Sequence, residues 1–237
     1  MVIQGRLMEV PEKGRHSEEA KADEAIQTVG PGSPRRFAAR DDDLGSLYRR
    51  LMQGGTGDAF DRQVFACAIA LAATELGRPL TAALGLPGPA LRALFAAYFP
   101  EETELLTGLG EDAGEDELEE PDLRALLMEH GSRGVREETW LAAIVARRSL
   151  GANHLWQDLG LSSRDDLSRL LLRHFRPLAA RNSGDMKWKK FFYRALCERE
   201  GALVCKAPNC AVCDDVSLCF GGEAGEPLAR LQDAHRR

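Results

Sequence analysis

Hydrophobic residues recur every three or four positions through the middle of this chain, the spacing that places them on one face of an α-helix. Glycine and proline follow these stretches: Gly77 and Pro79 end the first, and Gly151 ends the third. We therefore predict an all-α fold. The helices are expected over residues 60–76, 89–99, 137–150 and 163–175.

The four predicted helices form two pairs with the same internal order. Within each pair the helices are joined by a short segment of the form L-x3-L-G-L, at 80–86 in the first pair and 155–161 in the second. The second helix of each pair also carries apolar residues in nearly matching places. The recurrence indicates an internal duplication into two helix-turn-helix-like repeats.

Polar stretches divide the chain into parts. The first 45 residues mix charged residues with glycine, proline and serine and hold too few apolar residues for a core, which predicts a disordered leader. Between 101 and 122, eleven carboxylates occur without a lysine or arginine, and they lack the ligand spacing of a calcium motif. The predicted organisation is a leader over 1–45, a helical domain over 46–204 with a solvated acidic linker at 101–122, a cysteine-rich metal-cluster segment over 205–222 and a tail over 223–237.

Charge and composition narrow the class of protein. The formal net charge of the 237 residues is −6 at pH 7, which argues against a nucleic-acid partner, since binding to phosphate needs a basic surface. The N-terminus has no apolar stretch long enough for a signal peptide, and no window approaches the ~20 apolar residues of a membrane span. We expect a cytoplasmic protein without a membrane partner.

The helix-turn-helix pattern leaves a DNA-binding alternative open. Its recognition helices would be 89–99, which offers only Arg92 to read a base, and 163–175, which combines basic residues with two acidic ones. Packed helices with a tight turn are common in helical domains, so this is the weaker interpretation. The second helix carries Arg164, Asp165, Asp166, Arg169, Arg173 and His174.

Four cysteines near the C-terminus form a C-x4-C-x2-C-x5-C array. Thiolates so close in sequence favour a soft metal or an iron–sulfur cluster. An all-cysteine zinc site usually consists of two pairs separated by a dozen or more residues, so zinc is the second choice, and a zinc-stabilised helical interaction module is the matching alternative function. Disulfides would require an oxidising compartment. The candidate ligands are Cys205, Cys210, Cys213 and Cys219.

A helix is predicted directly before the cysteines, with Asp185 as its N-cap and Gly201 at its end. Its apolar face is expected to pack on the helical body and so to anchor the cysteine segment. Its basic face is typical of a solvated surface, but it could also hold an oxyanion such as molybdate, or an acidic partner. The apolar face contains Trp188, Phe191, Phe192, Ala195 and Leu196, and the basic face contains Lys187, Lys190 and Arg194.

Two further residues are weaker candidate metal ligands. Cys197 lies eight residues before Cys205, and His154 offers a nitrogen that could bind a heterometal. An uninvolved thiol and a helix-capping histidine are the commoner roles for such residues. Cys67, in an alanine-rich helix, is expected in the core. The sequence contains no phosphate-binding loop, no zinc-protease motif and no Ser/His/Asp pattern, so we do not expect a turnover enzyme.

Two stretches of the chain resemble a known family. The run 188–201, followed by the cysteine array and Phe220-Gly221, resembles NifQ, which processes molybdenum for the iron–molybdenum cofactor of nitrogenase, and Asn153 to Leu161 is similar to that family as well. The match covers about residues 150 to 221. The resemblance implies a bacterial cytoplasmic protein of nitrogen fixation whose iron–sulfur cluster, of the 4Fe–4S or 3Fe–4S type, takes up molybdenum and donates it.

The same resemblance implies the site and the partners. The family's cysteine ligands fall on Cys205, Cys210, Cys213 and Cys219. The substrate would be molybdate or a molybdenum–sulfur species, and the expected partners are the nitrogenase iron protein and the scaffold for cofactor assembly. Three functions therefore remain: an iron–sulfur molybdenum donor, a zinc-stabilised interaction module, and a DNA-binding regulator with a metal sensor.

Overall fold

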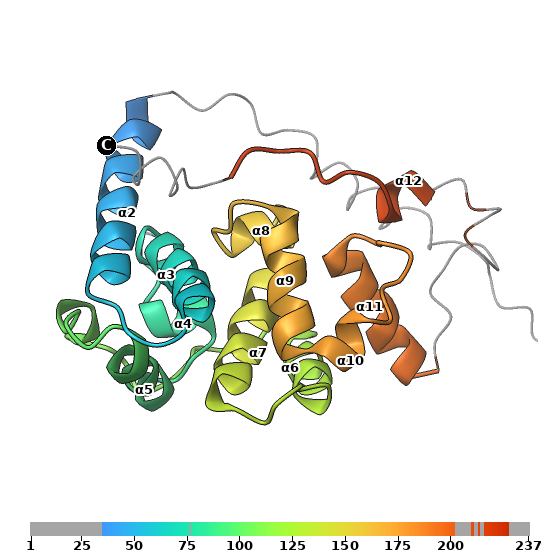
Figure 1. The fold of residues 1–237 in the computed structure, drawn as a ribbon, viewed down its shortest axis with the longest axis horizontal. Helices are drawn as coiled ribbons and strands as arrows, with labels where there is room; N and C mark the ends of the chain where they lie inside the picture. The colour runs from blue at the N-terminus through green and yellow to red at the C-terminus, as the bar shows by residue number, and fades with distance from the viewer. Residues whose placement is uncertain (1–34, 76, 202–209, 211–212, 214–215, 228–237) are drawn as a thin grey trace, which may run out of the picture. The chain divides into compact units, whose positions relative to one another are not determined.

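The computed structural model describes residues 35–75, 77–201, 210, 213 and 216–227 (Figure 1). The chain divides into two units, 1–38 and 39–237. Every regular element in the described residues is a helix, which confirms the all-α prediction, and none of these helices is long and apolar enough to cross a membrane. The elements are α2 (Arg35–Gln53), α3 (Ala59–Ala73), α4 (Leu80–Leu84), α5 (Gly88–Tyr98), the 3-10 helix η1 (Glu104–Leu106), α6 (Glu120–Glu129), α7 (Arg136–Ser149), α8 (Leu155–Asp158), α9 (Arg164–His174), α10 (Arg176–Ala179), α11 (Trp188–Arg199) and α12 (Val216–Cys219).

Both predicted repeats form a helix, a short helical turn and a second helix. The first consists of α3, α4 and α5, and the second consists of α7, α8 and α9. The two repeats lie side by side in Figure 1. In each turn the glycine takes a left-handed conformation, with φ of 65° at Gly85 and 70° at Gly160. The next amide then bonds back five positions, from Leu86 to Thr81 at 3.1 Å and from Leu161 to Trp156 at 2.9 Å. This is the hydrogen bond that closes a helix at a left-handed glycine.

The correspondence between the repeats extends to contacts that the sequence did not indicate. The amide of Thr56 bonds to the carbonyl of Tyr98 at 2.8 Å, and at the equivalent place in the second repeat the amide of Ser132 bonds to the carbonyl of His174 at 2.9 Å. The helices that precede the two repeats, α2 and α6, correspond as well. Their buried leucines are separated in sequence by the same interval as Thr56 and Ser132. These leucines are Leu47 and Leu51 in α2 and Leu123 and Leu127 in α6.

Helix α2 starts inside the segment predicted as a leader. Residues 35–45 are helical, while residues 1–34 of that segment lie outside the described part of the chain. Further along α2, Leu51 is fully buried and Tyr48 is 2% exposed, so the helix contributes to the core of the second unit. Burial raises the pKa of the Tyr48 hydroxyl.

Carboxylates of the segment 101–122 are paired with arginines from other parts of the chain. Glu120 is fully buried and lies 2.7 Å from Arg147 of α7. Asp116 lies 2.7 Å from Arg124, whose hydrogen bond lowers the pKa of the Asp116 carboxyl. Because none of these arginines belongs to the segment, its composition alone did not reveal them.

Helix α11 buries its aromatic face against the body. The predicted apolar stripe is buried, and Trp188 Nε1 donates to the hydroxyl of Ser168 on α9 at 3.2 Å. The predicted N-cap is wrong: Lys187 holds that position, while Asp185 has a positive φ of 55° and pairs with Arg164 at 2.9 Å. The Asn182 side chain bonds both the amide and the carbonyl of Met186 at 2.8 Å, so the turn closes before the helix starts.

Candidate metal centre

Three of the four array cysteines lie in the described residues, and Cys205 lies outside them, in 202–209. Cys210 is exposed, whereas Cys213 and Cys219 are half-buried. The amide of Cys213 bonds to the carbonyl of Cys210 at 3.4 Å, and the amide of Val216 bonds to the carbonyl of Cys213 at 3.3 Å. Val216 begins α12, and Cys219 is its last residue.

The start of α11 holds the last cysteine in place. The amide of Lys187 donates to the carbonyl of Cys219 at 2.8 Å, and its ammonium group donates to the carbonyl of Ser217 at 3.3 Å. The ring of Phe220 packs beside Gly184, where a Cβ would stand 3.4 Å from the ring edge. These contacts fix the position of Cys219 relative to the helical body, although the two segments are well separated in sequence.

The thiol donors suit a cluster in their chemical type, since sulfur ligands select iron–sulfur clusters, zinc and other soft metals. Within the described residues, however, no three side chains of His, Cys, Asp or Glu are grouped closely enough to hold a metal ion. Because Cys205 falls outside those residues, the prediction of a four-cysteine site stays a prediction. Its zinc and iron–sulfur versions both remain open on geometry.

The weaker candidates His154 and Cys197 are not gathered with the described cysteines into such a group. His154 is the N-cap residue of α8, and its amide donates to the Gln157 side chain at 3.1 Å. Its Nδ1 lies 3.8 Å from the carboxylate of Glu223, whose side chain is only 3% exposed. Cys197 is half-buried on α11. His154 therefore adjoins the segment that follows the array.

An ion pair that the sequence did not predict joins the two stretches on which the family resemblance rests. Lys189 of α11 places its ammonium group 2.5 Å from Asp158 and 2.6 Å from the carbonyl of Gly151. Beside it, the Gln157 side chain donates to the carbonyl of Glu226 at 2.7 Å. The signal available beforehand was the polar pair Gln157 and Asp158 inside an otherwise apolar turn.

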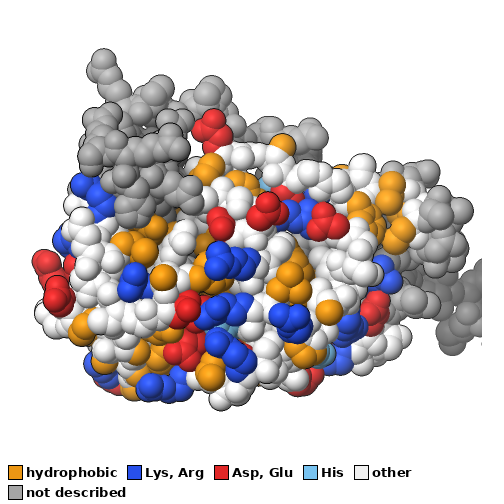
Figure 2. All heavy atoms as spheres, in the orientation of Figure 1, with side chains coloured by type: hydrophobic (Ala, Val, Ile, Leu, Met, Phe, Trp, Pro, Cys, Tyr) orange, Lys and Arg blue, Asp and Glu red, His pale blue; other side chains and the backbone are white. Residues whose placement is uncertain are grey.

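In the two helices proposed for DNA recognition, arginine side chains form ion pairs with carboxylates of the same chain. Arg92 of α5 pairs with Glu111 at 2.8 Å, and Arg173 of α9 pairs with Asp58 and Asp61, each at 2.9 Å. Figure 2 shows Lys and Arg side chains gathered near the centre of one face, with Asp and Glu among them. Such a mixed surface does not favour a phosphate backbone.

Comparison with known proteins agrees with the resemblance. The family model described as NifQ matches residues 64–221, two thirds of the chain. The chain belongs to the NifQ family. It is 42% identical over 179 residues to the protein NifQ homolog of Sinorhizobium fredii, covering 73% of this chain and 78% of the relative.

Two NifQ proteins show similar agreement. The chain is 45% identical to that of Azotobacter vinelandii over 155 residues, 59% of this chain and 78% of the relative. It is 43% identical to that of Rhodobacter capsulatus over 144 residues, 60% of this chain and 78% of the relative. No solved structure matches the chain. The family prediction is therefore confirmed, and its reach extends upstream to residue 64.

Proposed function

We propose that this NifQ-family protein processes molybdenum for the iron–molybdenum cofactor of nitrogenase, carrying an iron–sulfur cluster that receives molybdenum and passes it on. Membership of the family across residues 64–221 is the observation that carries the molybdenum role. The cysteine array supports the cluster, because its four thiols, Cys205, Cys210, Cys213 and Cys219, are sulfur donors close together in sequence.

The cluster would supply a soft sulfide environment that suits iron and reduced molybdenum better than oxygen ligands do. The chain's own residues position it: the amide of Lys187 holds the backbone of Cys219, and Cys210 is exposed. An exposed thiol can be reached by a partner that accepts the metal. We propose a donor protein of the cytoplasm, not a turnover enzyme, because the metal is its cargo.

The partners we propose are the nitrogenase iron protein and the scaffold on which the cofactor is assembled. The substrate would be molybdate or a molybdenum–sulfur species. Both proposals rest on family membership.

Anaerobic purification followed by elemental analysis tests the cluster. We expect iron and sulfide with visible absorption. One zinc per chain without iron would refute the cluster and would favour the zinc-stabilised interaction module.

Cys210→Ala tests whether the array is the site. Because Cys210 is exposed, the change should leave the helical content measured by circular dichroism unchanged while iron and molybdenum are lost together. Cys67→Ala is the matched control, since Cys67 is 2% exposed in the core and burial raises the pKa of its thiol, which disfavours the metal-binding thiolate. Full metal content in Cys210→Ala would place the metal elsewhere.

A further inference from the structure

A cavity of about 420 Å³ opens beside the end of the cysteine array. Its walls come from the turn that follows α10, from α11 and from the residue after Cys219. It therefore lies in the part of the chain that follows the two repeats. The residues that shape it are Arg181, Asn182, Met186, Arg194, Glu198 and Phe220.

Two arginines of the cavity share a single carboxylate. Arg181 Nη2 lies 3.1 Å from one oxygen of Glu198, and Arg194 Nε lies 2.7 Å from the other. The three side chains are 44%, 46% and 46% exposed, so solvent weakens both ion pairs. Among the described residues that line the cavity, two arginines face the single carboxylate of Glu198, so an incoming anion can compete with that carboxylate for the guanidinium groups.

The rest of the described wall adds no further carboxylate. Met186, Phe191 and Phe220 contribute apolar surface. The nearby carboxylate of Asp185 does not line the cavity and is paired with Arg164 at 2.9 Å. Two hydrogen bonds between Asn182 and Met186 hold the turn that follows Arg181.

We propose that this cavity binds a tetrahedral oxyanion, with Arg181 and Arg194 as its donors. The planar guanidinium group presents paired N–H donors that match the oxygens of such an ion. Phe220 of the cavity directly follows Cys219 in sequence, so the ion would be held beside the residue that follows the array. The choice of molybdate among tetrahedral oxyanions rests on the proposed function. The cavity would then bind molybdate before the metal is transferred to the cluster.

The test measures binding of molybdate, sulfate and phosphate to the anaerobically purified full chain by equilibrium dialysis at low salt, with iron determined in the same samples. Arg181→Gln combined with Arg194→Gln should weaken molybdate binding about tenfold or more without loss of iron. Glu198→Gln should tighten it, because the competing carboxylate is removed. Arg199→Gln is the matched control, since Arg199 also lies on α11 in exposed ion pairs but does not line the cavity.

Each outcome separates this inference from the proposed function. Unchanged molybdate affinity in the double variant overturns the cavity site, even if the protein carries its cluster. Tighter binding of sulfate or phosphate than of molybdate overturns the assignment to molybdate. Molybdate binding that responds to the variants in a protein without iron supports the cavity and contradicts the proposed cluster.

Discussion

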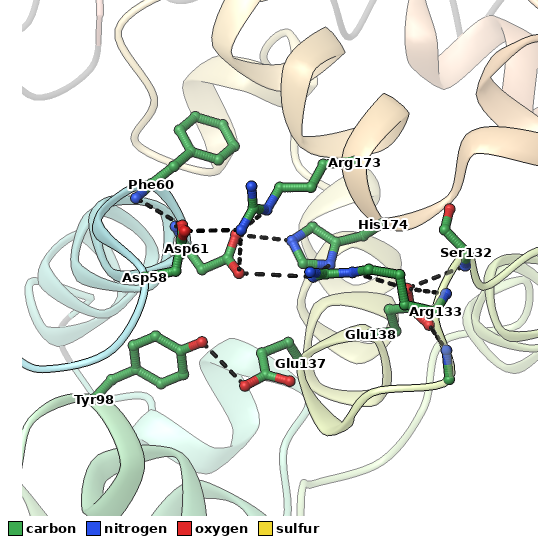
Figure 3. Close-up of polar contacts among 11 residues, drawn as sticks. Asp58, Phe60, Asp61, Tyr98, Ser132, Arg133, Glu137, Glu138, Arg173 and His174 are labelled. Carbon is green, nitrogen blue, oxygen red and sulfur yellow. Dashed lines mark hydrogen bonds and ion pairs between the residues drawn. The ribbon is translucent and has the colours of Figure 1, made fainter.

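Tyr98 and His174 stand at corresponding places in the two repeats, each at the end of the second helix, and both contact a carboxylate of the other repeat (Figure 3). The Tyr98 hydroxyl donates to Glu137 at 3.1 Å, and burial together with this hydrogen bond raises the pKa of the phenol. His174 Nε2 lies 2.9 Å from Asp61. Asp61 and Glu137 are separated in sequence by the same offset as Tyr98 and His174, so the two contacts are equivalents with the roles of the repeats exchanged.

The contact made by His174 belongs to a larger charged network than its equivalent. The side chain of Asp61 is 3% exposed and also pairs with Arg173 at 2.9 Å and with Arg133 at 3.9 Å. Arg133 Nη2 lies 3.2 Å from His174 Nδ1, and because a guanidinium group only donates, Nδ1 is the acceptor and Nε2 donates to Asp61. We call these two contacts between the repeats the first junction (Tyr98 with Glu137) and the second junction (His174 with Asp61). The same backbone geometry thus supports one simple hydrogen bond at the first junction and a charged network at the second.

The contrast between the junctions shows where the stability of the body is concentrated. A carboxylate that neutralises buried donors costs far more to remove than one that accepts a single bond at a partly exposed place. The second junction is therefore the more vulnerable of the two, although both have the same backbone geometry.

The largest contrast is expected between Asp61→Ala and Glu137→Ala. The first leaves the buried His174 without its acceptor and removes one of the two carboxylates that pair with Arg173, so it should cost about 3–5 kcal/mol of unfolding free energy. The second removes one hydrogen bond of Tyr98 and should cost about 1 kcal/mol. Urea unfolding followed by circular dichroism measures both. Equal losses would show that the charged network adds nothing to its junction.

A smaller contrast is expected between the two turn glycines. A Cβ at Gly160 would stand 2.8 Å from the carbonyl oxygen of Cys67, whereas a Cβ at Gly85 would stand 3.3 Å from the equivalent carbonyl of Ala143. Both changes force alanine into a left-handed conformation, and the first brings it closer to the opposing backbone. At Gly85 the nearest atoms belong to the side chains of Glu120 and Arg147, each at 3.1 Å. We expect losses of about 3 kcal/mol for Gly160→Ala and about 1–2 kcal/mol for Gly85→Ala.

Thermal unfolding of the two glycine variants, recorded at the same protein concentration, gives the order of their losses. A larger loss for Gly85→Ala would mean that the two turns do not meet their opposing helices as the structure describes.

The smallest effect concerns the first turn of α3, which has an N-cap carboxylate that the second repeat lacks. Asp58 accepts from the amides of Phe60 and Asp61 at 3.0 and 3.1 Å, whereas the corresponding position is Gly134. The amide of Asp61, and then Arg173, hold the pKa of the Asp58 carboxyl below its usual value. Asp58→Ala should cost about 1 kcal/mol at neutral pH.

This contribution should depend on pH in a defined direction. A carboxyl group whose pKa is lowered by folding stabilises the protein above its unfolded pKa of about 3.9, and the stabilisation is lost as the pH falls through the lower folded value. The difference between wild type and Asp58→Ala should therefore shrink below about pH 4. Asp58→Asn, which keeps a capping oxygen, is the control. A difference that persists in acid would assign the effect to something other than the carboxylate.

Sequence periodicity predicted α5, α7 and α9 to within one residue at each end, because each has a continuous apolar face and a clear terminator. The prediction extended the first helix to Leu76, whereas α3 ends at Ala73 with Thr74 as its C-cap. It also gave no helix over α2 or α6. The first residue of α6, Glu120, belongs by composition to the acidic segment, and its buried carboxylate depends on Arg147 from another part of the chain.

The same division applies to the candidate site. The cysteine spacing and the aromatic face of α11 could be recognised in the sequence, because both depend only on residue type and local order. The ion pairs of Lys189 with Asp158 and of Arg181 with Glu198 could not be predicted, because their members come from different elements. The pair of Arg194 with Glu198 is of the local i,i+4 type within α11.

The order of neighbouring residues was enough to specify the helical class, the two repeated turns and the family, since each of these depends on local pattern. Helix packing was needed to establish which carboxylate faces Tyr98 and which faces His174, and that a cavity with two arginines lies beside Cys219. Those features depend on the angles and distances at which separate helices pack, and no local pattern encodes them.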